Sequence, residues 1–250
     1  MYDLTAQQIS AVLKFREGGY SRRVFHFFRP ITLADWVAYE AAQNHRIEQR
    51  GTEDVQRRDL FGAAEQMWMD CIHHVAGYMI PRAVPAGAEP EYDELCDVHA
   101  DWRERMAPQH KVAAILGMQQ VTAEADEAAP ETDAPRVYIY DSAQMQIPIQ
   151  AARAGIEYPG LSHILRRPSG HEMRTFSRID AAALVVRGAR HPTAIVPSQI
   201  TALCRLYDAM VISVAGYCAG DREITSRDDA KSLMDPVHKK VAVMAAFLQQ

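Results

Sequence analysis

The feature that most constrains the fold is a four-residue string that occurs twice in the chain. Val75-Ala76-Gly77-Tyr78 returns as Val214-Ala215-Gly216-Tyr217, each at the end of an apolar stretch. In these stretches the apolar residues lie three and four positions apart, which is typical of a helix that buries one face. They are Phe61, Ala64, Trp68, Cys71 and Val75 in the first stretch, and Ile200, Leu203, Tyr207, Met210 and Val214 in the second. The pattern predicts helices over residues 61–78 and 199–217, the second capped by Ser198.

A second string follows each copy in the same order. Met106-Ala107-Pro108-Gln109-His110-Lys111 corresponds to Met234-Asp235-Pro236-Val237-His238-Lys239. A helix accepts proline in its first turn, so each string predicts a helix start, with Asp235 as a good N-cap. Two matches in the same order indicate a duplicated helical unit. An insertion near residues 85–92 explains the longer connection in the first copy.

An acidic segment lies where a boundary between the two copies is expected. Residues 122–135 contain five acidic residues, two prolines and neither lysine nor arginine. Because such a segment cannot bury enough apolar surface to order itself, we interpret residues 122–136 as an acidic linker. The predicted domains are a first helical repeat over residues 1–121 and a second over residues 137–250. The expected fold class is mainly α, of the α+β kind, and each repeat contains a short strand–turn–helix element.

The strand–turn–helix element is clearest in the first half. Aromatic and β-branched residues over positions 22–28 predict a strand, which Pro30 ends. Thr32, followed three residues later by Asp35, matches the sequence pattern of a capping box. A helix is therefore expected over residues 33–49.

Further elements are expected from weaker patterns. Thr5 and the apolar residues that follow it predict a helix over residues 5–15. In the second half we predict the corresponding strand over residues 173–177. Asp180 would then cap a shortened helix over residues 181–189.

Composition excludes several classes of protein. The 250 residues carry a formal net charge of −5, which argues against a protein that coats nucleic acid. We expect no membrane span, because no apolar run approaches twenty residues, and the first residues lack a signal-peptide pattern. The four cysteines form no CxxC pair, so a reducing compartment is the simplest interpretation. The expected location is the cytoplasm of a host cell or a virion.

Histidine–lysine pairs at the two predicted helix starts are the most informative polar residues. A cation in the first turn opposes the helix dipole, so a carboxylate, a partner or a bound anion should compensate it. One alternative is that each histidine packs against the preceding tyrosine while the lysine is solvated. Another is a regulatory module that binds an anion at these helix starts. The candidate interaction residues are Tyr78, His110, Lys111, Tyr217, His238 and Lys239.

Catalytic and metal chemistry find little support in the sequence. Glycine-rich phosphate loops, G-x-S-x-G elbows and H-E-x-x-H strings are absent, so we expect neither catalysis nor a cofactor. The alternative is a helical metal protein or an enzyme that uses His73, His74, Cys96 and His99. The spacing of these residues is poor, so no metal is expected. Arg166-Arg167-Pro168-Ser169 is interpreted as a solvated loop.

The segment Phe-Phe-Arg-Pro-Ile-Thr-Leu-Ala-Asp-Trp-Val-Ala-Tyr, which ends at Tyr39, resembles a strand–turn–helix signature of tail assembly chaperones of tailed bacteriophages. The helix ending in Val-x-Gly-Tyr and the following Pro-x-His-Lys string are similar to those of phage tail-region proteins. The second half has Ser177-Arg178-Ile179-Asp180 in place of Arg-Pro-Ile-Thr. The resemblance implies a non-enzymatic interaction component of virion or tail assembly. Its partners would be phage structural proteins or further copies of itself, without a membrane and without nucleic acid.

Overall fold

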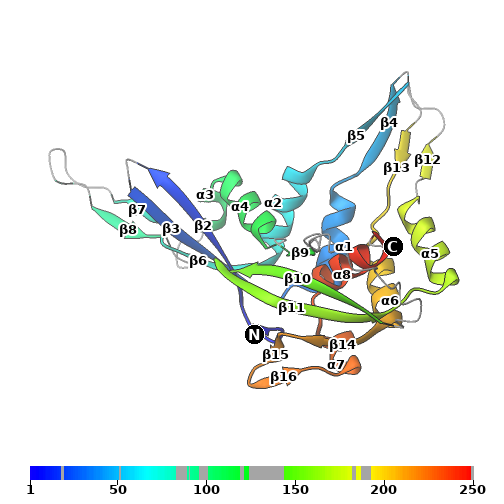
Figure 1. Ribbon diagram of the computed structural model, residues 1–250. Coiled ribbons are helices and arrows are strands. Elements are labelled where there is room, and N and C mark those ends of the chain that lie inside the picture. Colours follow the sequence, from blue (N-terminus) through cyan, green and yellow to red (C-terminus); the bar gives the residue numbers. More distant parts are fainter. Residues whose placement is uncertain are drawn as a thin grey trace, which may run out of the picture.

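The chain folds as a mixed α+β protein. The computed structural model describes residues 1–17, 20–50, 52–82, 89, 91–95, 101–118, 121–123, 144–181, 184–186 and 193–248. Within these ranges there are eight helices and five small sheets, with helices and strands in nearly equal shares of 40% and 37%. The α+β class is therefore confirmed, but the expectation of a mainly helical chain is wrong (Figure 1).

The elements follow one another in the same order in the two halves of the chain. After a short leading strand, β1 (Tyr2–Asp3), the first half consists of β2 (Ile9–Glu17), β3 (Tyr20–Phe28), α1 (Leu33–Ala42), β4 (Arg46–Arg50), β5 (Glu53–Arg57), α2 (Leu60–Cys71), β6 (Ile72–Ala76), β7 (Met79–Pro81), β8 (Tyr92–Glu94), α3 (Trp102–Arg105) and α4 (Pro108–Gly117), and the strand β9 (Val121–Ala123) follows it. The second half consists of β10 (Gln144–Arg153), β11 (Ile156–Arg166), α5 (Gly170–Asp180), β12 (Leu184–Val186), β13 (Thr193–Ile195), α6 (Ile200–Met210), β14 (Val211–Ala215), β15 (Tyr217–Ala219), β16 (Arg222–Ile224), α7 (Arg227–Leu233) and α8 (Pro236–Leu248).

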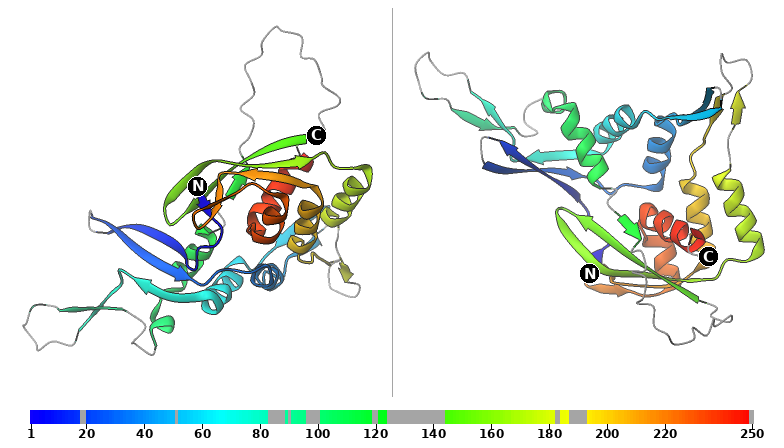
Figure 2. Two further views of the ribbon diagram at one scale, coloured as in Figure 1. Left: turned by 90° about the horizontal axis from the view of Figure 1, so that it is seen from below. Right: turned by 45° about the horizontal axis from the view of Figure 1, so that its top comes forward.

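Each half is built on an antiparallel sheet whose middle strand carries a buried histidine. In the sheet β2-β3-β6, His26 of β3 lies opposite Ala11 and Val75. In the sheet β9-β10-β11-β14, His163 of β11 lies opposite Ile147 and Val214. Helices α2 and α4 pack together over the first sheet, and α6 and α8 over the second (Figure 2). In each half, the two helices thus cover the face of the sheet that carries the histidine.

The two halves share strands as well as side-chain contacts. Strand β9 pairs with β10, β1 pairs in parallel with β15, and β13 pairs with β4 to give a four-stranded sheet β12-β13-β4-β5. The Glu40 carboxylate of α1 accepts hydrogen bonds from the backbone amides of Gln199 and Ile200 at the start of α6. It also accepts from Ser198 Oγ and pairs with Lys240 of α8. Ser198 is therefore not the cap of α6, because a carboxylate from the other half takes that role.

The long helices predicted over residues 61–78 and 199–217 are each too long by one strand. Helix α2 ends at Cys71 and is followed by β6, and α6 ends at Met210 and is followed by β14. The residues after each helix are rich in Ile and Val, which prefer strands, and they join the existing sheets as outer strands. Gly77 and Gly216, which follow these strands, adopt positive φ of 83° and 86°.

Several other expected elements have a different form. No helix forms over residues 5–15, and residues 9–15 belong instead to β2, in which apolar residues alternate. The helix expected over 33–49 ends at Ala42, and a β4–β5 hairpin follows. Residues 173–177, predicted as a strand, lie inside α5, because a capping box at Ser169 starts that helix at Gly170. In the range 181–189 the structure describes the strand β12 and no helix.

Other elements predicted from the sequence are present in the structure. The strand predicted over residues 22–28 is part of β3, and Thr32 with Asp35 forms a capping box. Pro108 and Pro236 each start a helix, and Asp235 Oδ1 accepts from the Val237 amide at 2.7 Å. The first two positions of the expected linker, 122 and 123, belong to β9, and the rest lies outside the described residues. None of the described helices has the length and apolarity needed to cross a membrane.

The close approach at Gly77 and Gly216 generates a prediction. A Cβ at Gly77 would lie 2.9 Å from the Arg23 carbonyl oxygen, and one at Gly216 would lie 2.9 Å from a Leu161 methyl and 3.0 Å from the Gly160 carbonyl oxygen. We expect Gly77→Ala and Gly216→Ala each to lower the free energy of unfolding by roughly 2–4 kcal/mol, measured by urea denaturation. Gly220→Ala is the matched control, because its φ is also positive but a Cβ there would meet open space. A loss for the control as large as for the other two would contradict this explanation.

Candidate functional site

A chain of hydrogen bonds links four buried or half-buried side chains in the first half. Trp68 of α2 donates its indole N–H to His26 Nδ1 at 2.8 Å. His26 Nε2 lies 2.7 Å from the Tyr78 hydroxyl, which lies 3.1 Å from His110 Nδ1 at the start of α4. The side chains come from β3, α2, the residue before β7, and α4. This first polar cluster therefore joins the sheet to both helices that cover it.

The indole fixes the direction of this chain, because a tryptophan N–H can only donate. His26 Nδ1 must be an acceptor, so its proton lies on Nε2 and is donated to Tyr78 Oη. The tyrosine hydroxyl is then free to donate to His110 Nδ1. Burial lowers the pKa of His26 to about 4, so the imidazole is neutral near pH 7 as this arrangement requires.

The second half contains a chain of the same composition with one substitution. The Tyr207 hydroxyl lies 2.7 Å from His163 Nδ1, and His163 Nε2 lies 2.8 Å from the Tyr217 hydroxyl. Tyr217 lies 2.9 Å from His238 Nδ1 at the start of α8. This second polar cluster is more deeply buried than the first, with exposure of 1% or less for all four side chains. Burial lowers the pKa of His163 far below its ordinary value and that of His238 to about 3.

A lysine closes each cluster on the side of the long helix. Lys111 Nζ lies 5.3 Å from the centre of the Trp68 ring and 3.1 Å from a carboxylate oxygen of Glu65. Lys239 Nζ lies 5.6 Å from the Tyr207 ring and 2.7 Å from a carboxylate oxygen of Asp208. Both lysines are buried, at 5% and 7% exposure, so the expectation of a solvated lysine is wrong. A carboxylate on the neighbouring helix compensates the cation, which was one of the three predicted possibilities.

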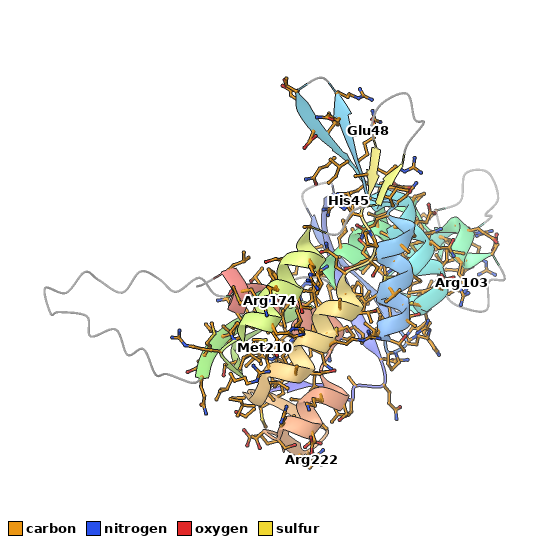
Figure 3. All side chains as sticks on the ribbon, turned by 90° about the vertical axis from the view of Figure 1, so that its right-hand side faces the viewer. His45, Glu48, Arg103, Arg174, Met210 and Arg222 are labelled. Atoms are coloured by element: carbon orange, nitrogen blue, oxygen red, sulfur yellow. The ribbon has the colours of Figure 1, made fainter. Side chains whose placement is uncertain are left out.

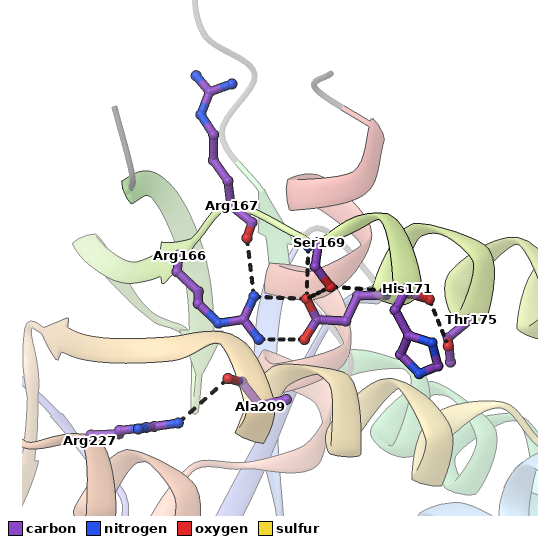
Figure 4. Close-up of polar contacts among 8 residues, drawn as sticks. Arg166, Arg167, Ser169, His171, Thr175, Ala209 and Arg227 are labelled. Atoms are coloured by element: carbon purple, nitrogen blue, oxygen red, sulfur yellow. Dashed lines mark hydrogen bonds and ion pairs between the residues drawn. The ribbon is translucent and has the colours of Figure 1, made fainter. Parts of the chain in front are cut away.

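In each half, an arginine that precedes a helix binds both oxygens of a carboxylate in the first turn of that helix. We call this ion pair a fork. The Arg29 guanidinium pairs with both oxygens of Asp35, which also accepts from the Thr32 amide and hydroxyl. Arg166 pairs in the same way with Glu172, which accepts from the Ser169 amide and hydroxyl (Figure 4).

These forks lower the pKa of Asp35 and hold the pKa of Glu172 at about 2, chiefly through the arginine hydrogen bonds. Arg166 is the last residue of β11, and residues 167–169 form a short loop, exposed at Arg167 and Ser169, whose last residue caps α5. The second half does carry an Arg-x-Pro-Ser counterpart of Arg-Pro-Ile-Thr. It lies about ten residues before the position predicted for it.

The candidate interaction residues all lie in these two clusters. Tyr78 and His110 are half-buried, whereas Lys111, Tyr217, His238 and Lys239 are buried. Any contribution of the four buried residues to a partner's binding would therefore act through the fold. Sequence reasoning missed His26 and His163, although each lies three positions before the arginine of its fork, in a His-x-x-Arg string. That shared spacing is the signal that could have found them.

The described residues do not form the geometry of a metal site. His73 and His74 lie side by side in β6, with their Nδ1 atoms 3.1 Å apart, and Cys96 and His99 lie outside the described residues. Among the residues that the structure describes, no three His, Cys, Asp or Glu side chains are grouped as a metal site. Cys71, Cys204 and Cys218 are buried free thiols, and burial raises the pKa of Cys71 and of Cys204 to about 11.

Two cavities are lined by residues of both halves. One, of about 420 Å³, is lined by Glu40, His45 and Lys240 among others. The other, of about 290 Å³, is lined by residues of β2, Trp36 and the β10–β11 turn. None of the four histidines of the polar clusters lines either cavity. The imidazoles and the larger cavities are thus not parts of a shared site.

No known protein-family model, curated protein or solved structure matches this chain.

The neutral histidines predict how stability depends on pH. An ordinary histidine takes up a proton near pH 6.5, whereas the folded protein resists protonation of His26 until about pH 4 and of His238 until about pH 3. Their contribution is therefore complete above pH 6.5 and is lost as the pH falls towards 4. At pH 4.5 we expect a loss of roughly 2–3 kcal/mol for each histidine relative to pH 7.5, measured by urea denaturation.

The acid loss of a histidine variant tests that explanation. Asp235, whose pKa is raised by burial, acts in the opposite direction and reduces the net slope. His26→Gln should be less stable than the wild type at pH 7.5 and should lose less on acidification. An unchanged acid loss in this variant would remove His26 as a cause.

The two capping boxes predict matched effects of substitution. Thr32→Ala and Ser169→Ala should each lower the free energy of unfolding by about 1 kcal/mol, because each removes the acceptor for the third amide of its helix. Thr175→Ala, in the middle of α5 where the hydroxyl only bonds the His171 carbonyl, should change it by less than about 0.5 kcal/mol. Thermal denaturation of the three variants side by side makes the comparison.

Proposed function

We propose that the chain is a non-enzymatic building block made of two halves that derive from one duplicated unit. The same element order occurs in each half, from the first hairpin to the last helix. The polar clusters support the equivalence residue by residue, since His26 corresponds to His163, Tyr78 to Tyr217, and His110 to His238. A common origin accounts for this agreement more simply than convergence on two buried four-residue networks would.

Backbone geometry supports the same equivalence. Gly77 and Gly216 each follow the outer strand and approach the backbone of the middle strand, at Arg23 and at Gly160. These two contacts lie three positions before His26 and His163. Trp68 and Tyr207, the residues that differ most in size, occupy corresponding places beside a histidine and a lysine.

The absence of catalysis is supported by how the clusters use their polar atoms. Each imidazole is neutral and buried or half-buried, and its partners are side chains of the core rather than groups facing a cavity. Such buried hydrogen-bonded networks hold a sheet and its helices in one arrangement. The single observation that carries the proposal is that the chain's most distinctive polar residues fasten each half together.

The resemblance of the segment ending at Tyr39 supplies the biological setting. We propose an assembly factor or structural part of a phage-type virion or tail, with phage structural proteins or further copies of the chain as partners. Three residues of that segment, Arg29, Thr32 and Asp35, build the strand–turn–helix junction. This gives the resemblance a physical basis, and the second half repeats it.

Affinity purification of the tagged chain from cells producing tailed phage tests the setting. We expect tail or capsid proteins to be recovered with the chain in stoichiometric amounts, identified by mass spectrometry. Met1-tagged and C-terminally tagged forms serve as controls for each other. Recovery of the chain alone would count against the proposal, and a stoichiometric metal in the purified protein would favour the metal alternative.

A further inference from the structure

We infer that copies of this chain join head to tail by pairing β5 of one copy with β12 of the next. The inference rests on the equivalence of the two halves proposed above, and not on the phage setting. Its starting point is the four-stranded sheet β12-β13-β4-β5, in which each half supplies one hairpin. The hairpin β4–β5 projects from the body of the protein, with His45 at its base and Glu48 farther out (Figure 3).

The joint inside this sheet is not two-fold symmetric. It pairs the second strand of one hairpin, β13, with the first strand of the other, β4. A two-fold relation would also pair β5 with β12 at the same joint, but these strands form the two opposite edges of the sheet. A joint of this heterologous kind leaves an acceptor at one end and a donor at the other, so a second copy can extend the sheet by repeating it.

The residues of the two edge strands, β12 and β5, support the pairing of each with a strand of another copy. Strand β12 has the sequence Leu184-Val185-Val186, and an apolar edge strand of this kind invites pairing with another strand. Strand β5 is mostly exposed, and among the described strands it pairs with β4 alone. The joint already present in the chain shows which strand pairing the two hairpins accept.

Other contacts between the halves show the same one-sidedness. The outer edge of β10 is covered by β9, whereas β2 is an edge strand of its sheet, and its Ser10 carbonyl accepts from the amide of Ala154 in the β10–β11 turn. Glu40 of the first half caps α6 of the second, whereas α2 is capped by its own Asp59. Within the described part of the chain, the first half therefore has no neighbour that corresponds to the one beside the second half.

The existing register fixes the register of the new joint. The amide of Val196 donates to the His45 carbonyl, so Ala194 and Ile47, two positions along each strand, also face one another with their backbone groups. Alternation along the strands then turns the backbone groups of Gln56 and Val185 towards the open edges. The equivalent joint places Gln56 of one copy opposite Val185 of the next, and Val55 opposite Val186.

Two proline substitutions block the two edges separately. Gln56→Pro removes an amide that faces the open edge of β5, and Val185→Pro does the same on β12. We expect the wild type to form species that are multiples of 28.0 kDa at micromolar concentrations, measured by light scattering with size exclusion. Each proline variant alone should be a single chain, whereas Gln56→Ala, which keeps the amide, should assemble like the wild type.

Mixing the two proline variants is the decisive experiment. The Gln56→Pro chain keeps an intact β12 and the Val185→Pro chain keeps an intact β5, so an equimolar mixture should give two-chain species and nothing larger. A wild type that stays a single chain would overturn the inference. Assembly that persists in both variants, or a mixture that forms no pair, would overturn it as well.

A cross-link confirms the register without relying on proline. Val55→Cys and Val186→Cys lie on a pair that is not hydrogen-bonded, where the Cα separation suits a disulfide. Because the chain has four native cysteines, the oxidised wild type is the reference. Oxidising a mixture of the two variants should give a covalent two-chain product beyond that reference, and either variant alone should give no more of it than the wild type. If both tests fail while tail proteins are still recovered with the chain, only the head-to-tail inference falls.

Discussion

A neutral histidine on the middle strand of each sheet holds the structure of each half together. His26 and His163 bond through both ring nitrogens, one to the long helix and the other to the tyrosine after the outer strand. That tyrosine passes the connection to the histidine at the start of the last helix. Because an imidazole can satisfy a donor and an acceptor on opposite sides, one side chain fixes three elements relative to one another. Removing it would leave several buried polar groups without partners, each at a cost of about 1–3 kcal/mol.

The clusters tolerate some exchange of parts while keeping their geometry. Trp68 and Tyr207 differ in shape, yet each places a polar group within hydrogen-bond distance of Nδ1 of the histidine and a ring face beside a lysine. The carboxylate beside the lysine comes from Glu65, one turn before Trp68, in one half and from Asp208, next to Tyr207, in the other. What the two halves hold in common is therefore the set of contacts around the histidine, and not the identity of every contributor.

Sequence reasoning found the repeated strings and the capping box at Thr32, because each depends on local spacing. It misplaced the ends of the long helices, since residues 72–75 and 211–214 continue the apolar pattern in a different conformation. Only the sheet into which these residues fit decides between helix and strand. The tertiary partners of Lys111, and the role of His26, depend on residues more than forty positions away, such as Glu65 and Trp68. The His-x-x-Arg spacing was visible, but nothing local gives it a meaning.

The parallel pairing of β1 with β15 brings Tyr2 beside Tyr217 and His238. On a ribosome, Tyr2 emerges long before the strand with which it pairs. The second half therefore cannot complete its core until more than two hundred further residues have been translated. Contacts this distant in sequence slow folding, because the chain must close a large loop before it gains their energy. During synthesis the N-terminal strand must wait unpaired, and its docking would mark the end of folding.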